Sequence, residues 1–415
     1  MNKTLAPIAA LLISVSILLA GQGLQGTLLP VRASLEDFST VAIGAMGAAY
    51  FFGFTLGCLT GGELVRRVGH VRVFLAMSAI ASASPLIHGL VVNPVAWGFL
   101  RLLTGFCLSV LYIVIESWLN HSATNENRGV IFSTYSMITL TVLAAGQMMT
   151  LMYDPSGFEL FIIASVLVSL GAVPVALSTA PSPEQPHSVS IDLPRLIRTS
   201  PSGALACLAT GLANGSFWAL APLFAAKIDN DVSLAAWFMT SAVIGGAITQ
   251  WPLGLLSDKI GRRKVLVAVS LAGSLAGLSL FLLAPVLQFW SAILLAALWG
   301  TLAFPLYTIA IAYTNDFADP SEYVTVSSGL LLVYGLGATA GPFIASLLMT
   351  RISNGSLFGF SAFVHIALVA FVGIRFISSR AVAEQPIAFG DALSAAQTTS
   401  QIFEEEVQQQ SGSDS

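Results

Sequence analysis

The sequence predicts an all-α polytopic membrane protein with twelve transmembrane helices in two halves of six. Three observations lead to this fold class: a strongly apolar composition, a series of long apolar runs, and one polar interruption near the centre of the chain. Of the 415 residues, 55% are hydrophobic and 9% are charged, whereas soluble domains carry about a quarter charged residues. The mean hydropathy is +0.83. This composition excludes a soluble enzyme, a nucleic-acid-binding protein and a disordered regulator.

Twelve apolar runs are long enough to span a bilayer, which takes about 20 apolar residues in a helix. They cover residues 5–30, 41–61, 71–92, 95–118, 130–152, 158–179, 202–225, 232–256, 264–286, 289–313, 323–350 and 356–378. The first run is longer than the apolar core of a signal peptide. We therefore expect it to remain as the first helix.

The one long polar interruption divides the runs into six and six. It covers residues 180–201 and contains five prolines. This predicts an N-terminal half at 1–179, a cytoplasmic linker at 180–201 and a C-terminal half at 202–378. The remaining residues, 379–415, hold six acidic residues against one base and are rich in Gln and Ser. Such a composition predicts a disordered, acidic cytoplasmic tail.

The distribution of basic residues predicts the orientation, because loops that carry Lys and Arg stay in the cytoplasm. With both termini inside, thirteen basic residues fall on the cytoplasmic side. Three fall on the outer side, namely Arg32, Lys227 and Arg351, and Arg101 lies within a span. We therefore expect a multi-pass protein of the bacterial inner (plasma) membrane with both termini cytoplasmic.

The two halves are related in sequence. An offset of 192 residues carries Gly62 and Gly69 onto Gly254 and Gly261, at the end of the second span of each half. The same offset relates positions in the first span of each half, which indicates a duplicated six-helix unit. Two parallel, pseudo-symmetric halves around a site near the bilayer midplane form the architecture of secondary transporters whose halves rock against each other.

The segment at residues 254–264, with the sequence GLLSDKIGRRK, resembles the loop signature of the major facilitator superfamily. Its glycines permit close helix approach and a tight turn. Asp258 can pair with the following bases or accept hydrogen bonds from a helix N-terminus. The resemblance implies the superfamily fold and a gating or conformational role for these positions: Gly254, Asp258, Gly261, Arg262, Arg263, Gly62, Gly69, Glu116 and Arg128.

The copy of this signature in the N-terminal half is degenerate. Residues 62–72 read GELVRRVGHVR, with Arg66 where the signature aspartate belongs. Either Glu63 or Glu116 is a candidate substitute. A narrower resemblance, to the YcaD-type subgroup of the superfamily, fits this departure, because the subgroup also lacks that aspartate. The residues that carry it are 115–117, 127–129, Tyr135, 146–147, 250–254 and 304–307.

Arg101 lies about six residues into the fourth span and aligns with the helix-four arginine of the superfamily. A charge in the hydrocarbon region costs about 2.5–3.5 kcal/mol on insertion scales. At 100° per residue, one helical sector of about 80° holds Arg101, Gly105, Leu108, Tyr112 and Glu116. This stripe faces a cavity if it is functional. In the alternative interpretation Arg101 snorkels outward and Glu116 pairs with Arg128 at the inner surface.

Buried amides and phenols complete the candidate substrate contacts. The resemblance implies that helices one, four, seven and ten line the cavity. The full candidate set is Arg101, Gln22, Gln25, Tyr112, Asn214, Tyr307 and Gln147. Hydrogen bonds between helices are the alternative role for each amide. No Asp or Glu lies near the middle of a span, so proton coupling follows from the resemblance alone and facilitated diffusion stays open.

The leading interpretation is a secondary active transporter that moves a small organic solute, anionic or zwitterionic, by alternating access with proton coupling. Two alternatives remain open: an exporter of amphipathic compounds, and a non-transporting receptor built on the same fold. An enzyme is not expected, because no nucleophile elbow or phosphate-binding loop occurs. Cys58, Cys107 and Cys207 show no metal-ligand spacing, so we expect no cofactor. The expected partners are the solute, protons and the lipid bilayer, and the chain is expected to be a monomer.

Overall fold

A computed structural model describes residues 8–124, 127–178, 193–229, 232–318 and 323–378. Within these ranges, twelve helices are long and apolar enough to cross a membrane. The predicted all-α membrane fold with twelve spans is therefore confirmed. The predicted tail at 379–415 lies outside the described residues.

The N-terminal half, called the N half below, contains the first six spans. Its helices are α2 (Ala9–Leu35), α3 (Thr40–Val68), α4 (His70–Leu90), α5 (Pro94–Ser122), α6 (Arg128–Met148) with the 3-10 turn η2 (Met149–Leu151), and α7 (Glu159–Gly171) continued by α8 (Val173–Ala176). A short helix, α9 (Leu193–Thr199), lies within the predicted linker.

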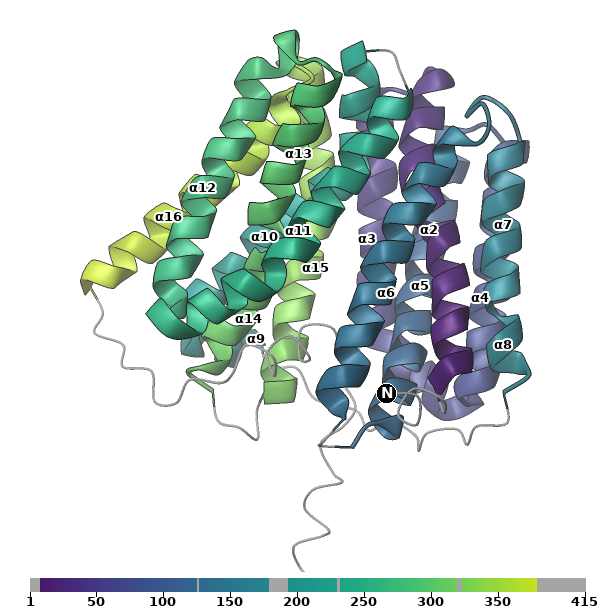
Figure 1. Ribbon diagram of the computed structural model, residues 1–415, viewed down its shortest axis with the longest axis horizontal. Helices are drawn as coiled ribbons and strands as arrows, with labels where there is room; N and C mark the ends of the chain where they lie inside the picture. The colour runs from purple at the N-terminus through teal and green to yellow at the C-terminus, as the bar shows by residue number, and fades with distance from the viewer. Residues whose placement is uncertain (1–7, 125–126, 179–192, 230–231, 319–322, 379–415) are drawn as a thin grey trace, which may run out of the picture.

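The C-terminal half, called the C half, contains the other six spans. Its helices are α10 (Pro201–Asp229), α11 (Val232–Ile260), α12 (Arg262–Leu283) with η3 (Ala284–Val286), α13 (Phe289–Ala303) continued by α14 (Pro305–Asn315), α15 (Tyr323–Arg351) and α16 (Ser356–Ser378). Figure 1 shows the halves side by side, the N half in purple to blue and the C half in teal to yellow.

The signature segments differ from the sequence prediction in one respect, because they are helical rather than loops. Gly62 and Gly254 lie inside α3 and α11, and each turn consists of one glycine. Gly69 has φ +93° and Gly261 has φ +97°. Residues with a side chain rarely adopt this conformation, whereas glycine adopts it freely. The duplicated glycines therefore make the same one-residue corner in both halves.

The helices run between two ends of the molecule. The end that bears the Gly69 and Gly261 turns lies at the bottom of Figure 1, and we call it the basic face. Its basic residues in the described ranges include Arg66, Arg67, Arg72, Arg195, Arg198, Lys259, Arg262, Arg263, Lys264 and Arg375. The other end, called the opposite face, bears the turns at 36–39, 91–93 and 152–158.

Contacts between the two halves are close toward the opposite face. Lys227 Nζ of α10 donates a hydrogen bond of 3.1 Å to Thr40 Oγ1 of α3. A Cβ added at Gly44 of α3 would collide with Ser346 of α15, and one at Gly47 would collide with Ala219 of α10. Small residues let helix backbones approach in this way. At this end the glycines of α3 thus pack directly against small side chains of the C half.

Candidate functional site

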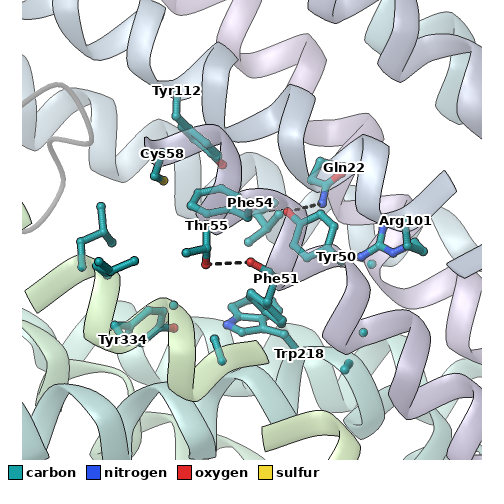
Figure 2. A pocket seen from close by; sticks show the side chains of 18 of the residues that line it. Gln22, Tyr50, Phe51, Phe54, Thr55, Cys58, Arg101, Tyr112, Trp218 and Tyr334 are labelled. Atoms are coloured by element: carbon teal, nitrogen blue, oxygen red, sulfur yellow. Dashed lines mark hydrogen bonds between the residues drawn. The ribbon is translucent and has the colours of Figure 1, made fainter. Parts of the chain in front are cut away.

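A cavity of about 290 Å³ lies between the halves, close to the middle of the helices. Its walls come from α2, α3, α5 and α6 of the N half and from α10 and α15 of the C half. Figure 2 shows most of its side chains. The polar and aromatic residues that line it are Gln22, Tyr50, Phe51, Phe54, Thr55, Cys58, Arg101, Tyr112, Gln147, Trp218, Ser328 and Tyr334.

Arg101 is the one charged residue among the described residues that line the cavity. Its Cζ lies 4.1 Å from the centroid of the Tyr50 ring. Its Nη1 is buried and has no hydrogen-bond partner in the described part of the chain. A cation over an aromatic face gains about 2 kcal/mol when desolvated, which only partly offsets the cost of burying a charge. The guanidinium therefore retains an unused donor.

Tyr50 is held by a second polar contact. Gln22 Nε2 of α2 donates a hydrogen bond of 3.1 Å to Tyr50 Oη, and Figure 2 shows Tyr50 between Gln22 and Arg101. Because the hydroxyl oxygen accepts from the amide, its own hydrogen remains available to another acceptor. Arg101 and Tyr50 together offer donors to the cavity.

The close approach of α5 to α3 explains why Arg101 meets Tyr50. A Cβ at Gly105 would collide with the carbonyl oxygen of Tyr50, and one at Gly53 would collide with that of Leu102. Gly105 is four residues after Arg101 and so lies on the same side of α5. The start of α5 is also fixed, because Asn93 Oδ1 caps the helix by accepting from the N–H groups of Val95 and Ala96.

Aromatic rings form the walls on both sides of the cavity. In the N half the rings of Phe54 and Tyr112 lie 6.1 Å apart. In the C half Trp218 is stacked on Phe304, with centroids 5.5 Å apart and an interplanar angle of 17°. Tyr334 of α15 lines the cavity near Trp218 (Figure 2). The arrangement suits an apolar, flat body with one anionic group, because aromatic faces pack well against such a body.

Four of the seven predicted substrate contacts line the cavity: Arg101, Gln22, Tyr112 and Gln147. Gln147 also joins the halves, since its Oε1 accepts a hydrogen bond of 3.2 Å from Thr240 Oγ1 of α11.

The other three predicted contacts do not line this cavity, and their role as substrate contacts stays a prediction. Gln25 and Asn214 are buried at 1% and 4% exposure and are not among the lining residues, although Asn214 contacts the lining residue Tyr334. The ring of Tyr307 packs against that of Tyr334 at 4.7 Å between centroids and does not itself line the cavity.

The predicted stripe on α5 is only partly a cavity face. Arg101 and Tyr112 lie on it, and Arg101 turns toward Tyr50 rather than snorkelling outward. Leu108 and Glu116 are buried at 1% and 3% exposure and do not line the cavity, and Gly105 packs on α3. The Arg128 side chain lies outside the described part of the structure, so the predicted Glu116–Arg128 pair stays a prediction.

Sequence reasoning missed the residues that contribute most of the lining. Tyr50, Phe54 and Cys58 follow one another at four-residue intervals on α3 and line the cavity. On the C half, Trp218 and Tyr334 were not predicted as contacts. The four-residue spacing on α3, beside a series of glycines, was the available signal. It could not be distinguished by sequence from an ordinary packing face.

The signature residues of the C half form a clamp at the basic face. Arg262, which is 4% exposed, places Nη2 3.0 Å from Asp258 Oδ1 and Nε 3.3 Å from Asp316 Oδ2. Asp316 follows α14 directly, so one side chain ties the α11–α12 corner to α14. Arg263 Nη2 donates a hydrogen bond of 3.0 Å to the carbonyl oxygen of Val372 in α16.

The corresponding corner of the N half is built differently. Glu63 pairs with Arg66 and Arg67 on its own helix, at 2.6 Å and 2.5 Å, and these side chains are exposed. His70 stands where the 192-residue offset places Arg262, and its Nε2 lies 3.1 Å from Ser117 Oγ of α5. Glu63 therefore makes local pairs instead of a link between helices.

No group of three His, Cys, Asp or Glu side chains able to hold a metal ion occurs within the described ranges.

Comparisons with known proteins agree with this architecture. The model of the Major Facilitator Superfamily matches residues 11–202 and 203–407. The chain is 29% identical over 378 residues to a protein described as "Uncharacterized MFS-type transporter YcaD" from Escherichia coli O17:K52:H18, covering 90% of this chain and 95% of the relative. A relative of the same description from Salmonella newport is 28% identical over 379 residues, with the same coverage.

Among solved structures, the crystal structure of the nucleoside transporter NupG superposes with a TM-score of 0.75 at 14% identity, covering 91% of this chain and 99% of that one. A bacterial homologue of the human lysosomal transporter Spinster gives a TM-score of 0.69 at 15% identity, covering 95% and 96% of the two chains. These likenesses show the fold. With the family model matching both halves, the chain belongs to the Major Facilitator Superfamily, whose members are transporters and not enzymes.

Proposed function

We propose that this protein is a secondary active transporter that carries a small organic solute with an anionic group, as an anion or a zwitterion, by alternating access. The observation that supports an anionic group is the burial of the Arg101 guanidinium without a carboxylate partner among the described residues that line the cavity. The guanidinium faces the cavity between the halves, lies over a ring instead of a carboxylate, and has a buried nitrogen without a described hydrogen-bond partner. A guanidinium binds a carboxylate through two parallel hydrogen bonds.

The placement of the interhalf contacts supports alternating access. The contacts of Thr40 and Gly44 with the C half lie toward the opposite face, beyond the cavity, and the contact of Gly47 with Ala219 lies at the edge of the cavity. In a transporter that rocks around a central site, one side of the site is closed at a time. We propose that this structure represents the state in which the opposite face is closed.

The orientation follows from charge. The basic face carries the arginines and lysines of the turns, and positively charged loops stay in the cytoplasm. We therefore propose that this face is cytoplasmic, that both termini lie on the same side, and that the protein functions as a monomer in the inner membrane of a bacterium. The bacterial origin of the matched relatives supports this location.

Proton coupling is the proposed source of energy, and Glu116 is the candidate carrier. It is a buried carboxylate on α5, one helical turn from the cavity residue Tyr112. Carboxylates within spans commonly mark proton pathways. The substitution Glu116→Gln should abolish accumulation driven by a pH gradient while leaving exchange of solute down its own gradient.

Flux into proteoliposomes tests the proposed function. Vesicles containing the purified protein are offered radiolabelled monocarboxylates and amino acids. Arg101→Ala should abolish uptake of the transported compound and Arg101→Lys should retain part of it. The expected loss of affinity is about ten- to a hundred-fold, because a hydrogen bond to a charged group contributes about 1.5–3 kcal/mol. Arg351→Ala, at an exposed arginine outside the cavity, is the matched control.

Two results would contradict the proposed function. If the Arg101→Ala protein takes up the compound at the rate of the unmodified protein, Arg101 does not bind the anionic group. Binding of a solute without flux in either direction would favour the receptor alternative.

A further inference from the structure

We infer that the solute is an amphipathic monoanion, a carboxylate or similar group attached to a flat apolar body such as an aromatic ring, and is not a zwitterion. The inference rests on the proposed function and narrows its solute class. Three features of the cavity carry it: the balance of charge, the hydrogen-bonding state of the polar groups, and the aromatic walls.

The balance of charge in the cavity favours a solute that carries one negative charge. Of the described residues that line the cavity, Arg101 is the one cation and none is acidic. A bound monoanion would neutralise the cavity. A dianion would leave one charge without a partner, and the ammonium group of a zwitterion would add a second positive charge beside the guanidinium. Unpaired charges in a dehydrated site are strongly unfavourable.

The polar groups of the cavity point to the same class, because several acceptors are already occupied. Gln147 Oε1 accepts from Thr240, and the carbonyl oxygen of Phe51 accepts from Thr55 Oγ1 at 2.9 Å. Tyr50 Oη accepts from Gln22. An ammonium group needs acceptors, and each of these three already accepts one hydrogen bond. A carboxylate needs donors, and the cavity offers Arg101 Nη1, which is buried without a described partner, and the hydroxyl hydrogen of Tyr50, whose oxygen accepts from Gln22.

The aromatic walls of the cavity indicate the shape of the uncharged part of the solute. Tyr50, Phe54 and Tyr112 face the cavity from the N half, and Trp218 and Tyr334 face it from the C half (Figure 2). A ring held between them would contact aromatic faces from both halves. The volume of about 290 Å³ is just below the range for ligand sites, about 300–1,000 Å³. The cavity therefore suits a small solute with a single ring or a compact apolar group.

Gly26 offers a way to change the size of the cavity without disturbing its surroundings. It lines the cavity on α2, and a Cβ added there would meet no described atom within 4 Å. The substitution Gly26→Leu therefore places a side chain in the space proposed for the ring. Gly98 on α5 also has no described atom within 4 Å of an added Cβ but does not line the cavity. Gly98→Leu is the matched control.

The first test compares probes that differ in charge or in the ring. They are phenylpropionate, its neutral amide phenylpropanamide, the zwitterion phenylalanine, the dianion phenylsuccinate, and propionate. Binding to the purified protein in nanodiscs is measured by titration calorimetry and by the shift in melting temperature. We expect phenylpropionate to bind at least tenfold more tightly than each of the other four.

The second test repeats the titration with three variants. In Arg101→Gln the preference for phenylpropionate over phenylpropanamide should disappear. In Gly26→Leu the affinity for phenylpropionate should fall at least tenfold, while that for propionate changes less than twofold. In Gly98→Leu both affinities should equal those of the unmodified protein. The melting temperature without probe shows whether each variant is folded.

The outcomes separate this inference from the proposed function. Phenylalanine or phenylsuccinate binding as tightly as phenylpropionate, or no binding of any ring-bearing probe, would overturn the inference. Arg101-dependent flux of a different anion would then leave the proposed function standing. Conversely, tight binding of phenylpropionate with no flux in either direction would uphold the solute class and overturn transport.

Discussion

At the scale of single residues, the cavity keeps a buried cation in place without neutralising it. The Tyr50 ring lies 4.1 Å from Arg101 Cζ, and Gln22 fixes the ring through its hydroxyl. A carboxylate in place of the ring would hold the guanidinium more strongly, but it would compete with any incoming anion. A ring orients the cation and leaves its hydrogen-bond donors free.

Tyr50 should therefore show two separable effects. Tyr50→Phe keeps the ring and removes the hydroxyl, so the affinity for phenylpropionate should fall about two- to tenfold, the worth of one neutral hydrogen bond. Tyr50→Leu also removes the cation–π contact, which should lower both the affinity and the melting temperature further. Calorimetric titration and thermal unfolding measure the two quantities. Equal behaviour of the Phe and Leu variants would show that the ring does not hold Arg101.

At the scale of the helices, glycine contacts determine where the functional side chains lie. Gly53 and Gly105 bring α3 and α5 into backbone contact, one turn from Arg101. In a membrane the helices gain little from the hydrophobic effect when they associate, so such close van der Waals contacts carry much of the packing. The position of the cation thus depends on small residues that do not line the cavity.

Gly105→Ala should test this dependence. The added methyl group would collide with the Tyr50 carbonyl oxygen, and overpacking of this kind costs about 1–3 kcal/mol. We expect a lower melting temperature and weaker binding, because the shift of α5 carries Arg101 with it. Gly98→Ala on the same helix has room for its methyl group and should be neutral or slightly stabilising. A Gly105→Ala protein that melts and binds like the Gly98→Ala protein would contradict the proposed contact.

The Arg262 clamp makes a second prediction at this scale. Arg262→Gln would break the buried pair of Arg262 with Asp316. Breaking a buried pair costs about 3–5 kcal/mol, so the melting temperature should fall strongly. Asp258→Asn removes a partner nearer to solvent, with 28% of its side chain exposed. It should slow flux while leaving stability and solute affinity nearly unchanged. Lys259→Gln, at an exposed neighbour, is the control. Unchanged flux in Asp258→Asn would show that the segment at 254–264 contributes only its positive charge, which orients the protein in the membrane.

The sequence predicts the helices far better than it predicts the cavity, for a physical reason. Each span is a local property, since hydropathy over about 20 residues decides whether a helix can cross the bilayer. Arg101, Gln22 and Gln147 were predictable because polar residues are rare in apolar spans. Tyr50 and Trp218 were not, because an aromatic ring in a membrane helix serves equally well in packing. Which ring faces the cavity depends on how α3 and α15 cross, and that is a property of the tertiary structure.

At the scale of the whole molecule, the halves meet through contacts of two kinds. Toward the opposite face, Gly44 of α3 packs against Ser346 of the C half, and at the edge of the cavity Gly47 packs against Ala219. At the level of the cavity, Gln147 and Thr240 form a hydrogen bond across the halves. A rocking motion would have to separate the glycine contacts, so their strength sets the balance between the two states of the carrier.

Gly47→Leu should shift this balance, because its side chain would collide with Ala219. Cys58 reports the shift, since it lines the cavity while Cys107 and Cys207 are buried elsewhere. In the unmodified protein a membrane-impermeant maleimide should reach Cys58 from the basic face. In Gly47→Leu labelling from the opposite face should increase several-fold.

Spheroplasts and inside-out vesicles present the two faces separately, and mass spectrometry of the labelled peptide identifies the modified cysteine. Gly98→Leu, whose side chain lies outside the interface, should label like the unmodified protein. If Cys58 of the Gly47→Leu protein is still labelled only from the basic face, the contact of Gly47 with Ala219 does not keep the opposite face closed.

The unneutralised guanidinium of Arg101 has a consequence for turnover. To return to its starting state, an empty carrier has to enclose a charge that lacks a counter-ion, at a penalty of several kcal/mol. A loaded carrier encloses a neutral pair and avoids most of that penalty. If the protein carries an anion as proposed, we expect the return of the empty form to be the slow step of the cycle. Solute on the far side of the membrane should then accelerate uptake of labelled solute on the near side. In kinetic terms, we expect exchange of solute to be faster than net transport.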